Sequence, residues 1–302
     1  MALPTLHGII PPLISPLTAQ LSLDAYALER IIEHVIAGGV SGIFLLGSTG
    51  EGPSMSVETK KDLIRESVKI SSGRIPVIVN ISSTSYLESR QMAEFAATEG
   101  SSYTVLSPSF YFKMNKSELL NYYWSLADHS PLPLLIYNAP EYTRGFIDAE
   151  LFKELSSHQN IKGIKDSSGN MAYIHELVNV RPDESFPILI GPEILLGESL
   201  LLGCNGGVCG GANLYPELYV KLYRAAVEKN MEEMARIQKV IQEIHTRLYT
   251  VASSPMGIVI GLKYLMWKRG LCSARMAMPV YETLSAEKKT ILETLHKEIL
   301  QL

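Results

Sequence analysis

The stretch "IKGIKDSSGN", residues 161–170, joins a short apolar run to an abrupt polar turn. Side chains of an extended strand alternate between its two faces, so Ile161, Gly163 and Lys165 are expected to share one face. An ammonium group that ends a buried apolar face is costly unless it has a function. Lys165 is therefore the first candidate functional residue, and the run around it is one of a series.

Short apolar runs alternate with segments of helical periodicity through the first three quarters of the chain. Most of the runs are apolar on both faces, which is typical of parallel strands covered by helices. The runs are residues 8–13, 42–47, 76–81, 103–107, 134–138, 161–165, 187–191 and 206–211. Eight strand–helix units in about 230 residues predict an α/β fold of the (β/α)8 TIM-barrel type. An open doubly wound sheet is the alternative, but it seldom needs eight regular units, and no GxGxxG turn follows the first run.

A helical region follows the last of these runs. Residues 234–251 place their apolar side chains on one helical stripe, and further helices are expected near residues 255–269 and 285–300. We therefore expect residues 1–229 to form the barrel. Residues 230–302 are expected to form a C-terminal helical extension that packs on the barrel or on a partner subunit.

The composition limits the partners of the protein. The 302 residues are 46% hydrophobic and 19% charged, with a net charge of −4, which indicates a large core and argues against disorder. No basic block is present, so nucleic acid and anionic membranes are not expected as partners. No apolar run reaches the roughly 18–20 residues of a membrane span, and the proline-rich start is unlike a signal peptide, so a cytoplasmic location is expected. Cys204, Cys209 and Cys272 suit neither a disulfide framework nor a zinc site and are expected to be reduced core thiols.

The carboxyl ends of the expected strands carry a distinctive set of side chains, and in a barrel this end holds the active site. The set comprises the turn "GSTGE" (47–51), then Tyr111, Tyr137 and Lys165. Three of these have a structural interpretation: the lysine could snorkel into solvent, the turn could cap the next helix, and Tyr137 could be a core residue. The functional interpretation is that the turn holds a carboxylate, while the desolvated amine of Lys165 attacks a ketone to form a Schiff base.

The order of these motifs resembles the dihydrodipicolinate synthase/N-acetylneuraminate lyase family of Schiff-base-forming class I aldolases. The resemblance covers essentially the whole chain. Its motifs are "GIIPPLISPL" (8–17), "GSTGE" (47–51), "YNAP" (137–140), "GIKDSSGN" (163–170) and "GGVCGGAN" (206–213). It implies a barrel with C-terminal helices and a small-molecule 2-oxo acid and an aldehyde as partners.

The resemblance also implies roles for individual residues. Lys165 matches the lysine that forms the Schiff base with pyruvate or another 2-oxo acid, and Tyr137 matches the tyrosine that relays protons beside it. Ser48 and Thr49 match the pair that binds the carboxylate, with Ser48 also in the relay. Tyr111 matches a tyrosine that the family donates across a dimer interface, which implies a homodimer or homotetramer.

Two further matches concern the wall of the pyruvate pocket. Gly191 and Val208 match positions that line it, the latter through its backbone carbonyl. No metal or cofactor is expected, because the protonated iminium on Lys165 would itself serve as the electron sink.

The sequence departs from the family at the positions that select the second substrate. Synthases of the lysine pathway carry an arginine five residues after the tyrosine of the YN motif, where this chain has Tyr142. Losing a bidentate carboxylate clamp is not conservative, and Arg144 could replace it only if the loop carries an insertion. Tyr142 is therefore expected to contact the substrate. Sialic-acid lyases are also disfavoured. They carry acidic residues after the pocket glycine, where this chain has Pro192-Glu193-Ile194, and a substrate-binding serine where it has Gly210.

We therefore expect a lyase that acts on a 2-oxo acid, such as a 2-oxo-3-deoxy sugar acid aldolase or a related dehydratase. The alternatives within the family are 4-hydroxy-tetrahydrodipicolinate synthase, which joins pyruvate to aspartate semialdehyde, and N-acetylneuraminate lyase. Two functions of different classes also stay open. One is a barrel enzyme that binds phosphate at "GCNGGVCGGAN" (203–213), and the second is a non-catalytic, effector-binding relative.

Overall fold

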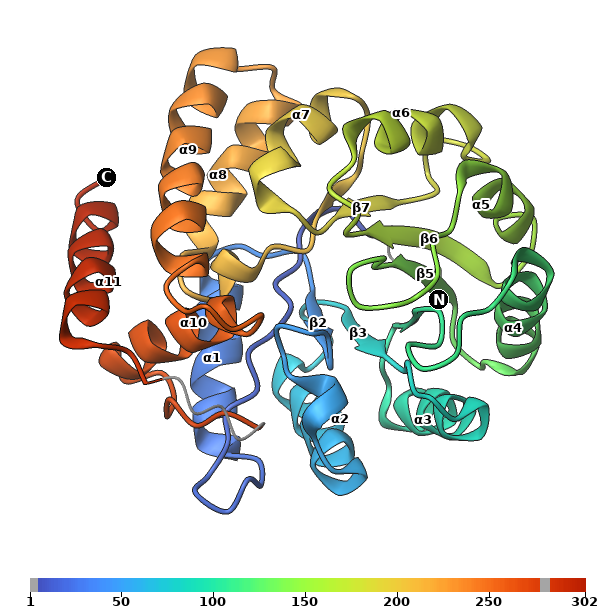
Figure 1. Cartoon of the computed structure of the whole chain (residues 1–302), viewed down its shortest axis with the longest axis horizontal. Helices are drawn as coiled ribbons and strands as arrows, with labels where there is room; N and C mark the ends of the chain where they lie inside the picture. Colours follow the sequence, from blue (N-terminus) through green and yellow to red (C-terminus); the bar gives the residue numbers. More distant parts are fainter. Residues whose placement is uncertain (1–4, 278–282) are drawn as a thin grey trace.

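Eight parallel strands form one curled sheet in the computed structural model, which describes residues 5–277 and 283–302 (Figure 1). The order of the strands across the sheet is β1-β8-β7-β6-β5-β4-β3-β2. The strands are β1 (Gly8–Ile9), β2 (Ile43–Leu45), β3 (Val77–Asn80), β4 (Tyr103–Leu106), β5 (Leu134–Asn138), β6 (Ile161–Asp166), β7 (Ile188–Ile190) and β8 (Gly206–Gly207). Seven of the predicted runs contain one strand each, and the eighth, residues 161–165, matches β6 except that the strand continues to Asp166, so all eight strands are confirmed.

An α-helix follows each strand and lies outside the curled sheet (Figure 1). These helices are α1 (Ala25–Ala37), α2 (Val57–Ser71), α3 (Tyr86–Glu99), α4 (Lys116–His129), α5 (Ala149–Leu155), α6 (Met171–Val180), α7 (Leu196–Leu201) and α8 (Pro216–Val227). Polar side chains fix where these helices begin. Asp24 accepts a hydrogen bond from the backbone N–H of Ala27 at the start of α1. At the start of α4, the Asn115 side chain accepts the backbone N–H of Glu118, and the Glu118 side chain accepts the backbone N–H of Asn115.

The two faces of the sheet carry separate apolar clusters. Along β5, for example, Leu134 and Ile136 belong to the cluster shared with the helices, whereas Leu135 belongs to the second cluster on the inner face. The inner cluster also joins distant strands, because the rings of Phe44 and Tyr137 meet edge to face with centroids 6.3 Å apart. Alternation with period two therefore sorts the side chains between the helix side and the interior of the curled sheet.

Backbone hydrogen bonds connect the two edges of this sheet. The N–H of Leu13 donates to the carbonyl of Phe44 at 2.8 Å, and the N–H of Phe44 donates to the carbonyl of Pro11 at 3.0 Å. The segment after β1 is thus bound to β2, and the carboxyl ends of the strands surround a common mouth. Eight parallel strands, their following helices and this connection agree with the predicted architecture.

The sixth strand departs from regular alternation. Leu134 pairs with Ile161 but Ile136 pairs with Ile164, so β6 carries one extra residue relative to β5. The extra residue falls at Gly163, whose φ of +155° and close approach to Leu135, 2.8 Å from the place of a Cβ atom, require glycine. Ile161 and Ile164 consequently both face the helices, and the prediction that Ile161 shares a face with Lys165 is wrong. Lys165 nevertheless points to the interior, as predicted.

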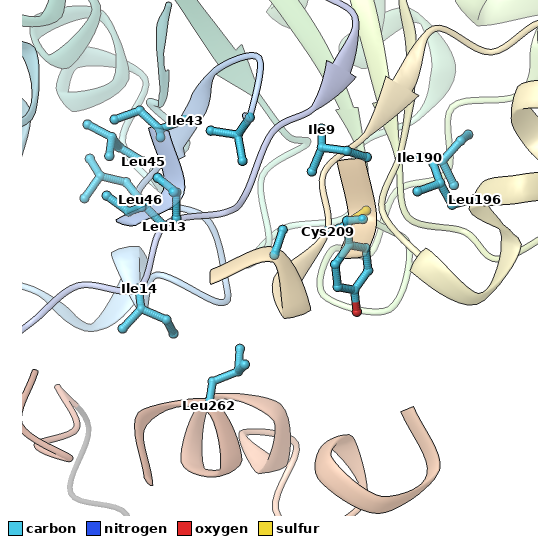
Figure 2. Close-up of a cluster of buried hydrophobic side chains, with 14 of the residues drawn as sticks. Ile9, Leu13, Ile14, Ile43, Leu45, Leu46, Ile190, Leu196, Cys209 and Leu262 are labelled. Atoms are coloured by element: carbon cyan, nitrogen blue, oxygen red, sulfur yellow. The ribbon is translucent and has the colours of Figure 1, made fainter. Parts of the chain in front are cut away.

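The C-terminal region is helical, as the sequence predicts. Helix α9 (Met231–Ile244) runs into a π-helical turn, η4 (His245–Tyr249), and is followed by α10 (Gly257–Lys268) and α11 (Ala286–Ile299). Helix α9 packs beside α8 (Figure 1). Figure 2 shows Leu262 pointing from α10 toward Ile14, in the segment after β1. The boundary between residues 229 and 230 stays a prediction.

Two smaller expectations concern the cysteines and the membrane. Cys204, Cys209 and Cys272 are buried and free, so the prediction of unpaired core thiols is confirmed. Within residues 5–277 and 283–302, none of the helices has the length and apolar character that spanning a membrane requires.

Candidate active site

A cavity of about 360 Å³ opens at the carboxyl ends of the strands. Seven of the eight site residues predicted from the sequence line it, and Tyr111 is the exception. The seven are Ser48, Thr49, Tyr137, Tyr142, Lys165, Gly191 and Val208. We call this cavity the strand-end pocket.

Lys165 and Tyr137 form the centre of the strand-end pocket. They are direct partners in the β5–β6 ladder, and the Nζ atom of Lys165 lies 3.9 Å from the centroid of the Tyr137 ring. Only 6% of Lys165 is exposed, and its Nζ atom donates a hydrogen bond to the hydroxyl of Ser167. A Cβ atom on Gly191 would stand 3.1 Å from the same Nζ and 2.2 Å from the Ser167 hydroxyl. Glycine at position 191 therefore keeps space open beside the amine.

The electrostatics of the strand-end pocket favour ionisation of Tyr137. Burial alone raises the pKa of a phenol, but the positive charge of Lys165 lowers it, as do hydrogen bonds with Lys165, Ser48 and Ser167. The net result is a pKa of Tyr137 below its ordinary value. A buried tyrosine with this property can exchange a proton with a bound molecule more readily than a free one.

The "GSTGE" turn, residues 47–51, places two hydroxyls at the mouth of the barrel. Its backbone closes through a hydrogen bond of 3.0 Å from the N–H of Glu51 to the carbonyl of Ser48. Gly50 approaches the carbonyl of Leu13 so closely that a Cβ atom would lie 2.7 Å from it. The turn leads into a short 3-10 helix, η1 (Gly52–Ser54), with Glu51 at its N-cap position, whereas α2 is capped by Ser56 and not by the turn.

Buried polar residues behind Tyr137 and Lys165 hold the ends of β5 and β6. Asn138 donates from its Nδ2 to Asp166 Oδ1 at 2.8 Å, and the hydroxyl of Ser168 donates to Asp166 Oδ2 at 2.8 Å. Burial raises the pKa of Asp166, and these hydrogen bonds act in the opposite direction. Sequence reasoning missed this pair. The signal was present, because each residue directly follows a predicted site residue on paired strands.

A second buried carboxylate forms part of the wall of the strand-end pocket. Glu193 is 3% exposed, and it accepts hydrogen bonds from the hydroxyl of Tyr219 and from the N–H of Gly211 on its two separate oxygens. Burial raises the pKa of Glu193, and the hydrogen bond from the Tyr219 hydroxyl opposes that rise. Glu193 therefore fixes the glycine-rich loop after β8, and its two oxygens are already engaged.

Side chains at the outer part of the pocket come from two distant segments. Glu141 and Tyr142 follow β5, whereas His245 and Tyr249 come from the π-helical turn. The His245 and Tyr249 rings meet at a centroid distance of 5.4 Å. Burial, followed by the nearby Glu141 carboxylate, raises the pKa of Tyr142, so this residue offers a neutral hydroxyl. Sequence reasoning missed His245 and Tyr249, because no local pattern indicates that a helix beyond the barrel reaches the pocket.

Tyr111 and Arg144 both lie outside the lining of the strand-end pocket. Tyr111 does not line the strand-end pocket; it is 68% exposed and packs on Phe112, which is 74% exposed. Its role at a neighbouring subunit stays a prediction. Arg144 is exposed and lies outside the pocket lining, whereas Tyr142 lies within it.

Comparisons with known proteins identify the family of the chain. Residues 5–299 match the dihydrodipicolinate synthetase family model. A probable 2-dehydro-3-deoxy-D-pentonate aldolase of Escherichia coli is 31% identical, over 93% of each chain. A 4-hydroxy-tetrahydrodipicolinate synthase of Methanosphaerula palustris is 28% identical, over 95% of this chain and 97% of the relative.

Solved structures similar to this chain belong to the same family. A dihydrodipicolinate synthase from Bacteroides thetaiotaomicron superposes with a TM-score of 0.93 at 38% identity, and 99% of this chain and 100% of that chain are covered. YagE of Escherichia coli, a member of the dihydrodipicolinic acid synthase family solved with pyruvate, superposes with a TM-score of 0.92 at 27% identity, over 99% and 100% of the two chains. The chain therefore belongs to the dihydrodipicolinate synthetase family, and it is an enzyme of the class I aldolase, or lyase, type.

Proposed function

We propose that this (β/α)8-barrel enzyme is a Schiff-base-forming lyase that cleaves or forms a C–C bond in a 2-oxo acid, with pyruvate as product or donor. We prefer a 2-oxo-3-deoxy sugar acid aldolase or a related dehydratase. The observation that carries the proposal is the buried Lys165 amine, which lies beside the Tyr137 ring and the Ser167 hydroxyl at the centre of the strand-end pocket.

The covalent step follows from the chemistry of a confined amine. The nitrogen of Lys165 adds to the ketone carbon of the 2-oxo acid, and loss of water leaves a protonated iminium. Tyr137, as phenolate, takes the proton from the hydroxyl on C4, the C3–C4 bond breaks, and its electron pair moves into the iminium to give an enamine. The aldehyde leaves, C3 of the enamine gains a proton, and hydrolysis releases pyruvate and free Lys165. The iminium is the electron sink, so these steps call for no cofactor.

The "GSTGE" turn supplies the proposed site for the carboxylate of the 2-oxo acid. Ser48 and Thr49 present hydroxyl groups at the rim of the strand-end pocket, in a turn whose backbone amides are close by. Such turns bind anions through convergent N–H and O–H donors. A carboxylate bound there would hold the ketone carbon next to the lysine, and the hydrogen bond between Ser48 and Tyr137 would join the two parts of the site.

The outer pocket favours a hydroxylated substrate over a second carboxylate. Among the described residues that line the strand-end pocket, Lys165 is the one lysine or arginine, while Glu141 adds a negative charge. Tyr142 and His245 offer hydrogen-bonding groups of the kind that bind polyol chains. The probable pentonate aldolase of Escherichia coli supports this preference, and the synthase of Methanosphaerula palustris keeps synthase activity as the second candidate.

Specific contacts argue against a sialic-acid lyase and against a phosphate-binding barrel enzyme. The lyase would need free acidic groups for the glycerol tail of its substrate, but both oxygens of Glu193 are engaged and Gly210 offers no hydroxyl. A phosphate on the glycine-rich loop would compete with Glu193, which already accepts the N–H of Gly211. A non-catalytic role would not explain why the buried amine of Lys165 lies beside Tyr137 in the pocket.

The substrate preference can be tested by comparing two reactions. Release of pyruvate from 2-oxo-3-deoxy sugar acids, coupled to lactate dehydrogenase, should be measurable, whereas condensation of pyruvate with aspartate semialdehyde should be poor. Removing the charged partner of a carboxylate costs about 1.5–3 kcal/mol, roughly 10- to 150-fold in affinity. Efficient condensation that is lost in Arg144→Ala, but not in the matched surface variant Arg90→Ala, would identify the enzyme as a synthase instead.

Assembly gives a second test of the proposal. A second cavity, of about 260 Å³, adjoins the first and shares Ser48, Tyr137 and Tyr142 with it, and Phe110 lies in its wall. We propose that Tyr111 of a neighbouring subunit completes this region, so the active form is a homodimer or a homotetramer.

Mixing Tyr111→Phe and Lys165→Met proteins should then restore activity, because each hybrid dimer contains one site with both Lys165 and Tyr111 intact. Sedimentation of a fully active monomer would contradict the proposal.

A further inference from the structure

We infer that the buried ion pair between Glu51 and Lys263 positions the "GSTGE" turn from the C-terminal helical region. Both side chains are 0% exposed, and the pair joins residues 212 positions apart in the chain. The consequence for pyruvate binding rests on the proposed function, whereas the effect on the conformation of the turn does not.

The pair joins three segments of the chain at one point. The Nζ atom of Lys263, on α10, donates to Glu51 Oε2 and to the carbonyl of Arg275. The other oxygen of Glu51 accepts the N–H of Ala277 at 2.7 Å. The turn after β2, helix α10 and the segment that follows α10 therefore share one network in which both carboxylate oxygens are used.

Glu51 is the residue through which this network can control the turn. It follows Ser48 and Thr49 closely, and its φ of +57° lies in the left-handed region that side chains with a Cβ atom rarely adopt. Its N–H closes the turn on the carbonyl of Ser48, and its own carbonyl accepts the N–H of Ser54 at 2.9 Å. A strained backbone of this kind persists when its surroundings hold it in place, and the buried side chain of Glu51 provides such an anchor.

The other end of the network, Lys263, lies on the helix whose first turn forms part of the wall of the strand-end pocket. Pro255 and Ile258, just before and within the first turn of α10, line the pocket, and Lys263 lies further along the same helix. Leu262, its neighbour, points from α10 into the core near Ile14 (Figure 2). The ion pair thus fixes the position of the turn that carries Ser48 and Thr49 relative to the start of α10.

Stability alone does not account for a fully buried pair in this place. Replacing such a pair by apolar groups of similar size is often neutral or favourable, whereas removing one partner leaves an uncompensated buried charge. These two effects can be separated experimentally. The variants are Glu51→Gln, Lys263→Met and the double variant, and Lys268→Met is the matched control. Lys268 lies on the same helix and pairs with Glu293 at 3.0 Å, but these side chains are 44% and 39% exposed.

The first experiment measures the apparent dissociation constant of pyruvate, by borohydride trapping at a series of pyruvate concentrations. The melting temperature of each variant is measured in parallel. We expect the double variant to melt closer to the wild type than either single variant does, yet to bind pyruvate at least about tenfold more weakly. Lys268→Met should match the wild type in both respects. A folded double variant with wild-type affinity for pyruvate would overturn the inference.

The second measurement is hydrogen exchange of the amides at residues 47–52 in Glu51→Gln, which keeps an acceptor for Ala277 but loses the ion pair. We expect these amides to exchange at least about tenfold faster than in the wild type, with no change at the centre of β6. Unchanged exchange in the turn would overturn the inference. A wild-type protein that traps no pyruvate would refute the proposed function, and the exchange experiment would still decide the role of the pair.

Discussion

Lys165→Met is expected to lower turnover of a 2-oxo acid by about 10⁴- to 10⁶-fold, because the covalent intermediate can no longer form. Methionine keeps the length and the apolar stem of the side chain in the interior of the curled sheet. The variant also removes a buried amine, so its fold should be retained and its melting temperature should not fall far. The coupled assay for pyruvate measures the loss of turnover, and circular dichroism follows the melting.

Lys162→Met is the matched control for this variant. Lys162 lies on the same strand, but its side chain is exposed on the other side of the bulge at Gly163. Its replacement should leave turnover unchanged. Retention of a tenth or more of wild-type activity in Lys165→Met would assign the chemistry to another group.

Tyr137→Phe is expected to lower turnover by roughly 10²- to 10⁴-fold while leaving Schiff-base formation partly intact. The ring stays packed against Phe44, but the hydroxyl that exchanges the proton is lost. In the wild type, cleavage should become faster as the pH rises through the pKa of Tyr137, because the phenolate is the form that accepts the proton. That pKa lies below the ordinary value of tyrosine, and the corresponding limb of the pH profile should be absent from the variant.

Tyr123→Phe provides the control for loss of a buried tyrosine hydroxyl. The Tyr123 hydroxyl donates to the carbonyl of Leu106 at 2.8 Å, between α4 and β4, and does not line the strand-end pocket. The backbone of Tyr137 also hydrogen-bonds this hydroxyl, so its loss should cost about 1–3 kcal/mol of stability, but the Tyr137 hydroxyl stays in place and activity should be retained. Near-normal turnover in Tyr137→Phe would make that tyrosine structural as well.

The fold could be predicted from the sequence because its signals are local and repeated. Runs that are apolar on both faces indicate parallel strands, and each is followed by a segment of helical period. The exception is the bulge in β6, where the alternation that places Ile161 beside Lys165 fails. A glycine inside a strand is compatible with a bulge, but the pairing register depends on Leu135 and Pro187, which come from neighbouring segments.

The inner part of the site was also predictable, because its residues stand at strand ends and the barrel brings those ends together. The outer part was not. His245 and Tyr249 reach the pocket through a π-helical turn, and Glu51 meets Lys263 across most of the chain. Such contacts depend on how α10 packs against the barrel, and nothing in the sequence near either residue indicates them. Tyr111 shows the same limit, since its predicted role depends on a second subunit.

The most direct test of the proposed chemistry is reductive trapping of the native protein with pyruvate and borohydride, followed by peptide mass spectrometry. The account predicts one reduced pyruvyl group per chain, located on Lys165 and absent from Lys165→Met. Labelling at any other lysine, or no label on Lys165 in active protein, would contradict it.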